Sequence, residues 1–80
     1  MTADELIEIY ADVLETTGIA HDEDFFAAGG DSLLATRVLS AVARAGGAEL
    51  TFEDFRSAPT PRALSALLTA RRTALLEAAP

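Results

Sequence analysis

The sequence predicts an all-α fold, a four-helix bundle made of three longer helices and one short helix. Alanine and leucine dominate a chain that is 50% hydrophobic, and its β-branched residues are scattered, which favours helix over strand. Apolar residues also recur with the period of about 3.6 residues that marks amphipathic helices. Because 80 residues bury only about 60% of their unfolded surface, we expect one compact core and a single domain over residues 1–80.

The first helix is expected from Thr2 to about Thr17. The segment TADE is a capping box, in which Thr2 caps the helix and Glu5 reaches back to it. Gly18 is expected to stop the helix in the left-handed conformation. Acidic residues lie on one arc of this helix, and the opposite arc carries the apolar residues Leu6, Ile7, Tyr10, Val13 and Leu14.

A long connection at residues 18–31 precedes the second helix, and long ordered loops are usually functional or packed by their own side chains. At least one of Phe25 and Phe26 should be buried, since two exposed phenylalanines would be costly. The second helix is expected from Ser32 to Ala45. Its apolar arc holds Leu34, Val38, Ala41, Val42 and Ala45, with Leu39 at the edge.

Two further helices complete the predicted bundle. The segment TFED predicts a short helix in which Phe52 and Phe55 face the same way and dock on the core. Thr60 then caps the last helix, Pro61 occupies its first position, and the helix reaches about Glu77. Its apolar arc carries Leu64, Leu67, Leu68 and Leu75.

The composition excludes several classes of function. The formal net charge is −7, so the chain repels DNA, RNA and anionic lipid on average, and basic protein surfaces suit it better. It has no cysteine, which excludes disulfides and thiolate metal sites. An acidic N-terminus without a following apolar run does not fit a signal peptide, and no segment approaches the roughly 20 apolar residues of a membrane span. We therefore expect a cytoplasmic monomer.

The segment GGDSL contains the one serine that stands where a helix begins, Ser32. It does not fit a nucleophile elbow, because the required second glycine is Leu34 and no strand precedes the serine. An EF-hand loop starting at Asp22 would need a glycine at its sixth position, where the chain has an alanine. Two adjacent glycines are too few for a phosphate-binding loop. The lone His21 is expected to be a solvated loop residue rather than a base or a metal ligand.

Two interpretations of this segment remain. In the first, Gly29 and Gly30 only permit positive φ, Asp31 caps the helix and Ser32 is its first residue. That interpretation leaves Leu33 on the polar arc without a reason. In the second, the glycines give a partner access to the backbone, the helix start favours an attached phosphate, and Leu33 offers an apolar contact to a docking protein. Such a segment is a modification site that partner enzymes recognise.

The segment EDFFAAGGDSLLATRVL, from Glu23 to Leu39, resembles the signature of peptidyl carrier proteins, the thiolation domains of nonribosomal peptide synthetases. The short helix with Phe52 and Phe55 and the segment APTPRALSALL after it also look like that family, so the resemblance covers nearly the whole chain. It implies a bundle of the acyl carrier protein type. Met1 and the end at Pro80 suit a discrete protein, although a domain cut from a larger synthetase would look the same.

The resemblance implies that Ser32 is the attachment point of 4'-phosphopantetheine, with Gly29, Gly30, Asp31 and Leu33 as its motif. A phosphopantetheinyl transferase would transfer the arm from coenzyme A with Mg²⁺. An adenylation enzyme would then load the thiol, and condensation or tailoring enzymes would use the aminoacyl or peptidyl thioester. The chain itself would catalyse nothing and hold no metal.

Partner docking is expected at Leu33 and Arg37. The exposed arc of the second helix carries arginines rather than the acids typical of fatty-acid carriers, so docking should rely on Leu33 and neighbouring apolar residues more than on acidic steering. Plain solvation of the helix surface is the alternative interpretation of the arginines. Two alternative functions also stay open. One is an acyl or aryl carrier protein of a polyketide, fatty-acid or siderophore pathway, and the other is an unmodified helical interaction module.

Overall fold

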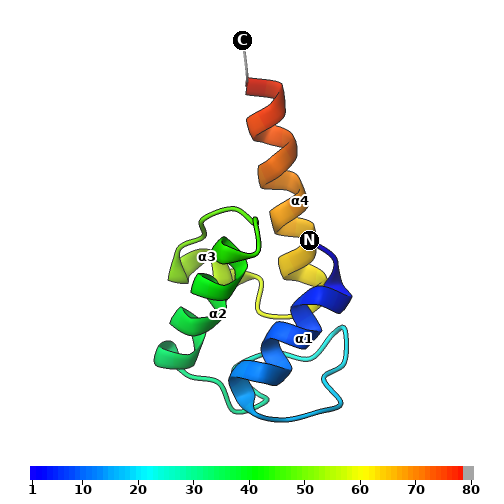
Figure 1. Ribbon diagram of the computed structural model, residues 1–80, viewed down its shortest axis with the longest axis vertical. Coiled ribbons are helices and arrows are strands. Elements are labelled where there is room, and N and C mark those ends of the chain that lie inside the picture. Colours follow the sequence, from blue (N-terminus) through cyan, green and yellow to red (C-terminus); the bar gives the residue numbers. More distant parts are fainter. Residues whose placement is uncertain (79–80) are drawn as a thin grey trace.

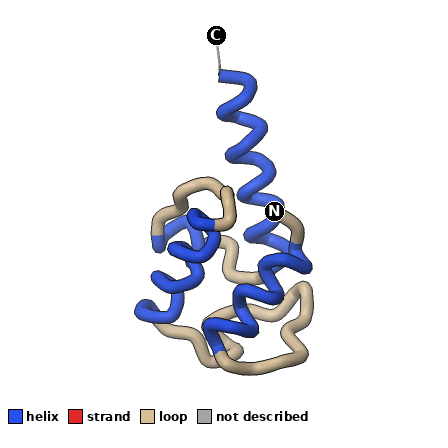
Figure 2. Tube along the Cα trace, viewed as in Figure 1, coloured by secondary structure: helices blue, strands red, loops and turns tan. Residues whose placement is uncertain are grey.

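A computed structural model describes residues 1–78, with the side chains of residues 1–74. It contains four helices, α1 (Ala3–Leu14), α2 (Ser32–Arg44), α3 (Phe52–Ser57) and α4 (Pro61–Ala78), and no strand within the described part of the chain. Helix α1 packs against α2 and α4, and α2 packs against the short α3 (Figure 1). Long loops join the first three helices, as Figure 2 shows. The predicted all-α bundle of three longer helices and one short helix is therefore confirmed.

Helix α1 begins as predicted but ends earlier. Thr2 and Glu5 form the capping box, with each side chain accepting a hydrogen bond from the other residue's backbone N–H. The predicted end near Thr17 is wrong, because Glu15 adopts a left-handed conformation (φ 53°) and stops the helix after Leu14. Gly18 is left-handed as expected (φ 77°), but it lies in the loop that follows.

The core combines side chains of all four helices with two side chains of the long loop, Ile19 and Phe25. The residues that are completely buried include Leu6, Tyr10, Phe25, Ala35, Val38, Val42, Phe55 and Leu64. The prediction that Phe25 or Phe26 is buried is confirmed by Phe25, while Phe26 is half-buried. The loop therefore contributes to the core and is held by it.

Two predictions about apolar side chains need correction, and a third falls outside the described side chains. Ala45 is exposed because α2 ends at Arg44, and Ala35 takes a place on the buried face. Phe52 does not dock on the core fully, since 37% of it stays exposed beside the ring of Phe26. Leu75 was predicted on the apolar arc of α4, but its side chain lies outside the described residues.

Tyr10 joins the core to the chain that enters α4. Its ring lies 5.0 Å from Phe25 and 5.8 Å from Phe55, measured between ring centroids. Its hydroxyl donates a hydrogen bond of 2.9 Å to the carbonyl oxygen of Pro59, which also accepts the Phe25 N–H at 3.2 Å. Burial, with a smaller contribution from the charge of Asp24, raises the pKa of Tyr10 well above its ordinary value.

A polar contact fixes the start of α3 against α4. Thr51 caps α3, and Asp54 accepts the Thr51 N–H at 3.0 Å in a second capping box. The Asp54 carboxylate also accepts two hydrogen bonds from the Arg71 guanidinium, the shorter at 2.8 Å. The Thr51 N–H first, and Arg71 second, hold the pKa of Asp54 below its ordinary value. None of the described helices is long and apolar enough to cross a membrane.

Candidate functional site

Ser32 is the first residue of α2 and is exposed to solvent. Asp31 caps the helix as predicted, and its carboxylate accepts the Leu34 N–H at 2.9 Å. The Ser32 hydroxyl makes no hydrogen bond with any residue whose side chain is described. Because the first N–H groups of a helix have no partner within it, negative charge attached to this hydroxyl is favoured.

The loop before Ser32 is fixed by its own hydrogen bonds. The carboxylate of Asp24 accepts the N–H groups of Phe26 at 2.8 Å and Ala27 at 3.2 Å, which closes a turn. The Gly30 N–H then donates to the carbonyl oxygen of Phe25 at 3.0 Å. Since Phe25 is buried in the core, the loop is anchored there, and the position of Ser32 at its end is fixed as well.

Gly29 and Gly30 have different roles. Gly29 has a φ of 112° and open space where a side chain would stand, so its conformation requires glycine and leaves its surface free. Gly30 has no such φ, but a Cβ there would lie 2.8 Å from the carbonyl oxygen of Phe25 and closer still to its ring. That both glycines give clearance to a partner stays a prediction, and at Gly30 the structure shows a separate need for glycine, which is room for Phe25.

His21 is an exposed residue of the long loop, and it lies close to an acid of α1. Its Nε2 is 2.9 Å from the carboxylate of Asp4, and half of the side chain is exposed. The backbone carbonyl of His21 accepts the N–H of Arg62, while the Arg62 side chain pairs with Asp22 at 2.9 Å. The prediction that His21 is a solvated loop residue is confirmed, and its exposed side chain contacts Asp4 in addition. Through its side chain and its backbone carbonyl, His21 links the loop that precedes α2 to α1 and to α4.

The predicted docking residues lie next to Ser32 on the exposed side of α2. Leu33 is 65% exposed, the largest exposure of any large hydrophobic residue among the described side chains, and Arg37 is exposed as well. The prediction that Leu33 lies on the outer face of the helix is confirmed. Its docking role stays a prediction.

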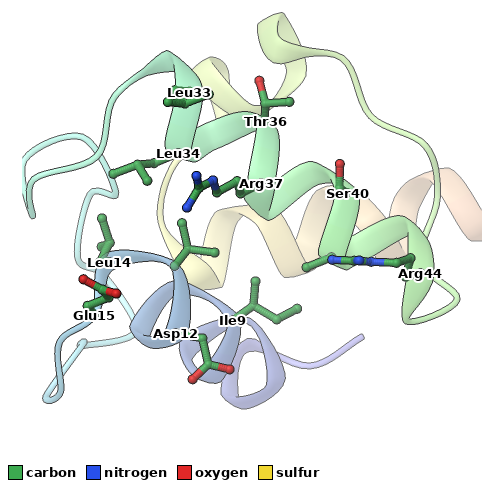
Figure 3. A pocket seen from close by; sticks show the side chains of 12 residues that line it. Ile9, Asp12, Leu14, Glu15, Leu33, Leu34, Thr36, Arg37, Ser40 and Arg44 are labelled. Carbon is green, nitrogen blue, oxygen red and sulfur yellow. The ribbon is translucent and has the colours of Figure 1, made fainter.

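A groove between α1 and α2 opens beside Leu33. We call it the α1–α2 groove, and it is bounded by Ile9, Val13 and Leu14 of α1 and Leu34, Arg37 and Arg44 of α2. In Figure 3, Leu14 lies across from Leu34 and Ile9 lies across from Arg44, so the two helices run in opposite directions along it. Sequence patterns did not reveal this groove, because half-buried apolar residues on two helices have the same pattern as residues of the core.

Among the residues whose side chains are described, no three histidine, cysteine or acidic side chains come together as metal ligands. The arrangement around Ser32 offers an exposed hydroxyl, a helix start and an apolar contact. These features suit covalent attachment of a phosphate-containing group better than binding of a free ligand.

Comparison with family models matches residues 4–68 to the family described as Phosphopantetheine attachment site. The chain is also 41% identical over 69 residues to the probable nonribosomal peptide synthetase CymA of Salinispora arenicola. That alignment covers 85% of this chain and 1% of the relative, so the chain spans only a very small part of this curated relative.

Two solved structures are similar over most of the chain. A structure titled Non Ribosomal PCP domain shares 35% identity, covers 82% of this chain and 84% of its own, and has a TM-score of 0.72. The second is a chain in the structure of the phosphopantetheine transferase Sfp in complex with coenzyme A and a peptidyl carrier protein. It shares 31% identity, covers 88% of this chain and 91% of its own, and has a TM-score of 0.83.

Proposed function

This chain belongs to the phosphopantetheine attachment site family, and we propose that Ser32 is the residue that carries its 4'-phosphopantetheine arm. The predicted function is confirmed: the chain is a phosphopantetheine-dependent carrier domain of the nonribosomal peptide synthetase type. The predicted cofactor, 4'-phosphopantetheine, is confirmed as well. The proposals below concern the residue that is modified, the absence of catalysis by the chain, and the partner enzymes.

The exposed hydroxyl of Ser32, fixed at the loop–helix junction, is the observation that supports this assignment most strongly. In the proposed step, Ser32 Oγ attacks the phosphorus of coenzyme A that bears the pantetheine. The phosphodiester to Ser32 forms, the bond to 3',5'-ADP breaks, and the hydroxyl proton passes to a base of the transferase. The N-terminal end of α2 favours the resulting negative charge.

The chain is proposed to supply no catalytic group to this step or to later ones. Its one histidine is held by Asp4, and the carboxylate of Asp31 is engaged by the Leu34 N–H. A partner with its own base and Mg²⁺ must therefore activate the hydroxyl. The domain contributes a rigid point of attachment, and the arm supplies a thiol that forms a thioester with the cargo.

Tethering explains why a carrier without catalytic groups is useful. A cargo held by a flexible arm meets each partner active site at a raised effective concentration, without release into solution. We propose an adenylation enzyme as the loading partner and condensation or tailoring enzymes as the later ones. A cytoplasmic location and a monomeric state stay predictions.

Partner docking is proposed to use Leu33 as its apolar contact and Arg37 as a polar one. Both are exposed on the turn of α2 that follows Ser32, so a partner that reaches the arm also reaches them. A small apolar contact with a charged neighbour suits an encounter that must also dissociate.

The direct test is the mass of the intact protein after incubation with coenzyme A, Mg²⁺ and a permissive transferase. We expect the mass of the wild type to rise by one phosphopantetheine and the mass of Ser32→Ala to stay unchanged. An equal rise in both proteins, or no rise in either, contradicts the proposal. Ser40→Ala is the matched control, because Ser40 is another exposed serine of α2 and should leave the modification intact.

A further inference from the structure

We propose that the surface within reach of the arm is free of amines and thiols, so that the domain holds a reactive thioester without acylating itself. Arg37 is the residue on which this depends most, because it places a positive charge beside Ser32 without a nucleophile. The inference rests on the proposed attachment at Ser32. It adds a property of the chain that determines which cargoes survive on the arm between two partners.

All six basic residues of the chain are arginines, and the chain contains neither lysine nor cysteine. The difference between the two basic side chains matters beside a thioester. A neutral lysine amine attacks a carbonyl carbon, whereas a guanidinium group stays protonated in proteins and has no free electron pair to offer. Arginine therefore supplies the positive charge that suits a phosphodiester and leaves the thioester intact.

The reaction that this surface avoids is transfer of the acyl group to nitrogen. An amine would attack the thioester carbonyl, a carbon–nitrogen bond would form, the carbon–sulfur bond would break, and the thiol would leave with the proton of the amine. Because the arm is tethered, an amine near Ser32 would compete with the partner enzymes at a raised effective concentration. The amide product would hold the cargo on the domain and end its use.

The arm reaches the first turns of α2 more easily than its far end. It has roughly thirteen chain bonds from phosphorus to sulfur, which extend over roughly 15 Å if three bonds span about 3.5 Å as in an extended peptide. At about 1.5 Å of rise per residue, Arg37 lies about 8 Å from Ser32 along α2, and Arg44 at the end of the helix lies about 18 Å away. Since helical side chains tilt toward the N-terminus, the arm also starts on the side of Ser32 away from Arg44.

The primary amine of the chain lies beyond that far end. As the N-terminus of this chain, Met1 carries its one primary amine, and Figure 1 marks this end beside α4. The carbonyl oxygen of Met1 accepts a hydrogen bond of 2.9 Å from the Ser65 hydroxyl of α4. Met1 also borders a hollow together with Gly46 and Ala48, which follow the last turn of α2. The amine is therefore separated from Ser32 by the whole length of α2.

The one imidazole of the chain is also kept away from the attachment point. The Nε2 atom of His21 is 2.9 Å from the carboxylate of Asp4, which belongs to the first turn of α1. Helix α1 runs opposite to α2, with Leu14 across from Leu34 in Figure 3, so the last turn of α1 is the one near Ser32. From Asp4 to Leu14 the helix rises about 15 Å, which places the imidazole near the opposite end of α1.

A hydroxyl close to Ser32 lacks the base that would make it a competitor. Serine and threonine attack a carbonyl efficiently only when an adjacent base takes the proton. Thr36 lies one turn after Ser32, and its hydroxyl donates to the backbone carbonyl oxygen of Ser32 at 3.0 Å. The proton of this hydroxyl is thus engaged by a group that does not act as a base.

Substitution of single arginines by lysine tests the proposal on the whole domain. A permissive transferase with acetyl coenzyme A loads acetyl-phosphopantetheine, and the mass of the intact protein at this stage reports separately whether the arm is attached. The loaded proteins are kept at about pH 9, where lysine amines are partly neutral, and then treated with hydroxylamine, which cleaves thioesters and leaves amides. The acetyl that stays on the protein measures transfer to nitrogen.

We expect Arg37→Lys to retain at least about tenfold more acetyl than the wild type, with peptide mapping that places it on the substituted side chain. Arg72→Lys is the matched control, because Arg72 is exposed and borders the same hollow as Met1, and it should behave as the wild type. Equal retention in Arg37→Lys and the wild type would show that a lysine beside Ser32 is harmless and would overturn the proposal. Equal retention in the two variants, or retention that grows with protein concentration, would overturn it as well.

Discussion

Substitution of Gly30 by alanine should destabilise the domain because the added methyl group has no space. Its Cβ would lie 2.8 Å from the carbonyl oxygen of Phe25 and even closer to two ring carbons. The ring is completely buried, and its centroid lies 5.0 Å from those of Tyr10 and Phe55, so it cannot move aside freely. The clash therefore has to be relieved by displacement of the loop that carries Ser32.

The expected magnitude follows from two opposing effects. Overpacking of a filled core costs about 1–3 kcal/mol, while the reduced freedom of the unfolded chain returns about 0.4–1 kcal/mol. We expect Gly30→Ala to lower the free energy of unfolding by roughly 1–2 kcal/mol. At about 4–8 °C per kcal/mol for a domain of this size, the midpoint of thermal unfolding should fall by roughly 5–15 °C.

Urea denaturation followed by circular dichroism measures the loss, and a double-mutant cycle identifies its cause. If the clash is with the ring of Phe25, the cost of Gly30→Ala should shrink by at least about 0.5 kcal/mol in a Phe25→Leu background. An unchanged stability together with slower phosphopantetheine transfer would refute this reasoning. That result would return Gly30 to the role of clearance for a partner enzyme.

The remaining predictions concern three side chains. Tyr10→Phe removes the hydrogen bond to Pro59 and should cost about 1 kcal/mol in urea denaturation, and an unchanged midpoint would contradict the contact. Burial raises the pKa of Tyr10 in the folded state, so stability should be level below pH 10 and decline above it, with tyrosinate absorbance appearing only well above its ordinary value of 10.0. Asp54→Asn should destabilise the domain at neutral pH, because the backbone N–H of Thr51 first, and Arg71 second, lower the pKa of the Asp54 carboxyl. The difference from wild type should vanish as pH falls below the ordinary value of 3.8, and a difference independent of pH would exclude the carboxylate as its cause. Leu33→Arg should change the unfolding free energy by less than about 0.5 kcal/mol because the side chain is exposed, yet slow loading by an adenylation enzyme, and full activity with every partner would remove Leu33 from the docking surface.

Features set by neighbouring residues were predictable from the sequence. The caps at Thr2 and Asp31 are local hydrogen bonds between residues three apart, and both are present. The exposure of Leu33 follows from helical periodicity alone, because it depends only on which face of α2 is buried. The motif around Ser32 is also a run of neighbouring residues, and it indicated the family that the comparisons show.

Features set by distant contacts were not predictable. Helix α1 ends where Glu15 adopts a left-handed conformation. That conformation is rare for a non-glycine residue, so the sequence pattern pointed instead to Gly18, three residues later. The hydrogen bond from Tyr10 joins residues 49 positions apart, and no periodic pattern records it. The separate roles of Gly29 and Gly30 emerge only once the position of the Phe25 ring is known.

The central claim is that Ser32 carries the arm, and peptide mapping of the modified protein tests it most directly. The chain contains no lysine, so trypsin cleaves first after Arg37 and leaves Ser32 and Thr36 in one peptide, with Ser40 in the next. We predict that the added phosphopantetheine is found in the peptide ending at Arg37, with fragment ions that place it on Ser32. Placement on Thr36 or Ser40, or on any residue in the Ser32→Ala variant, would contradict the claim.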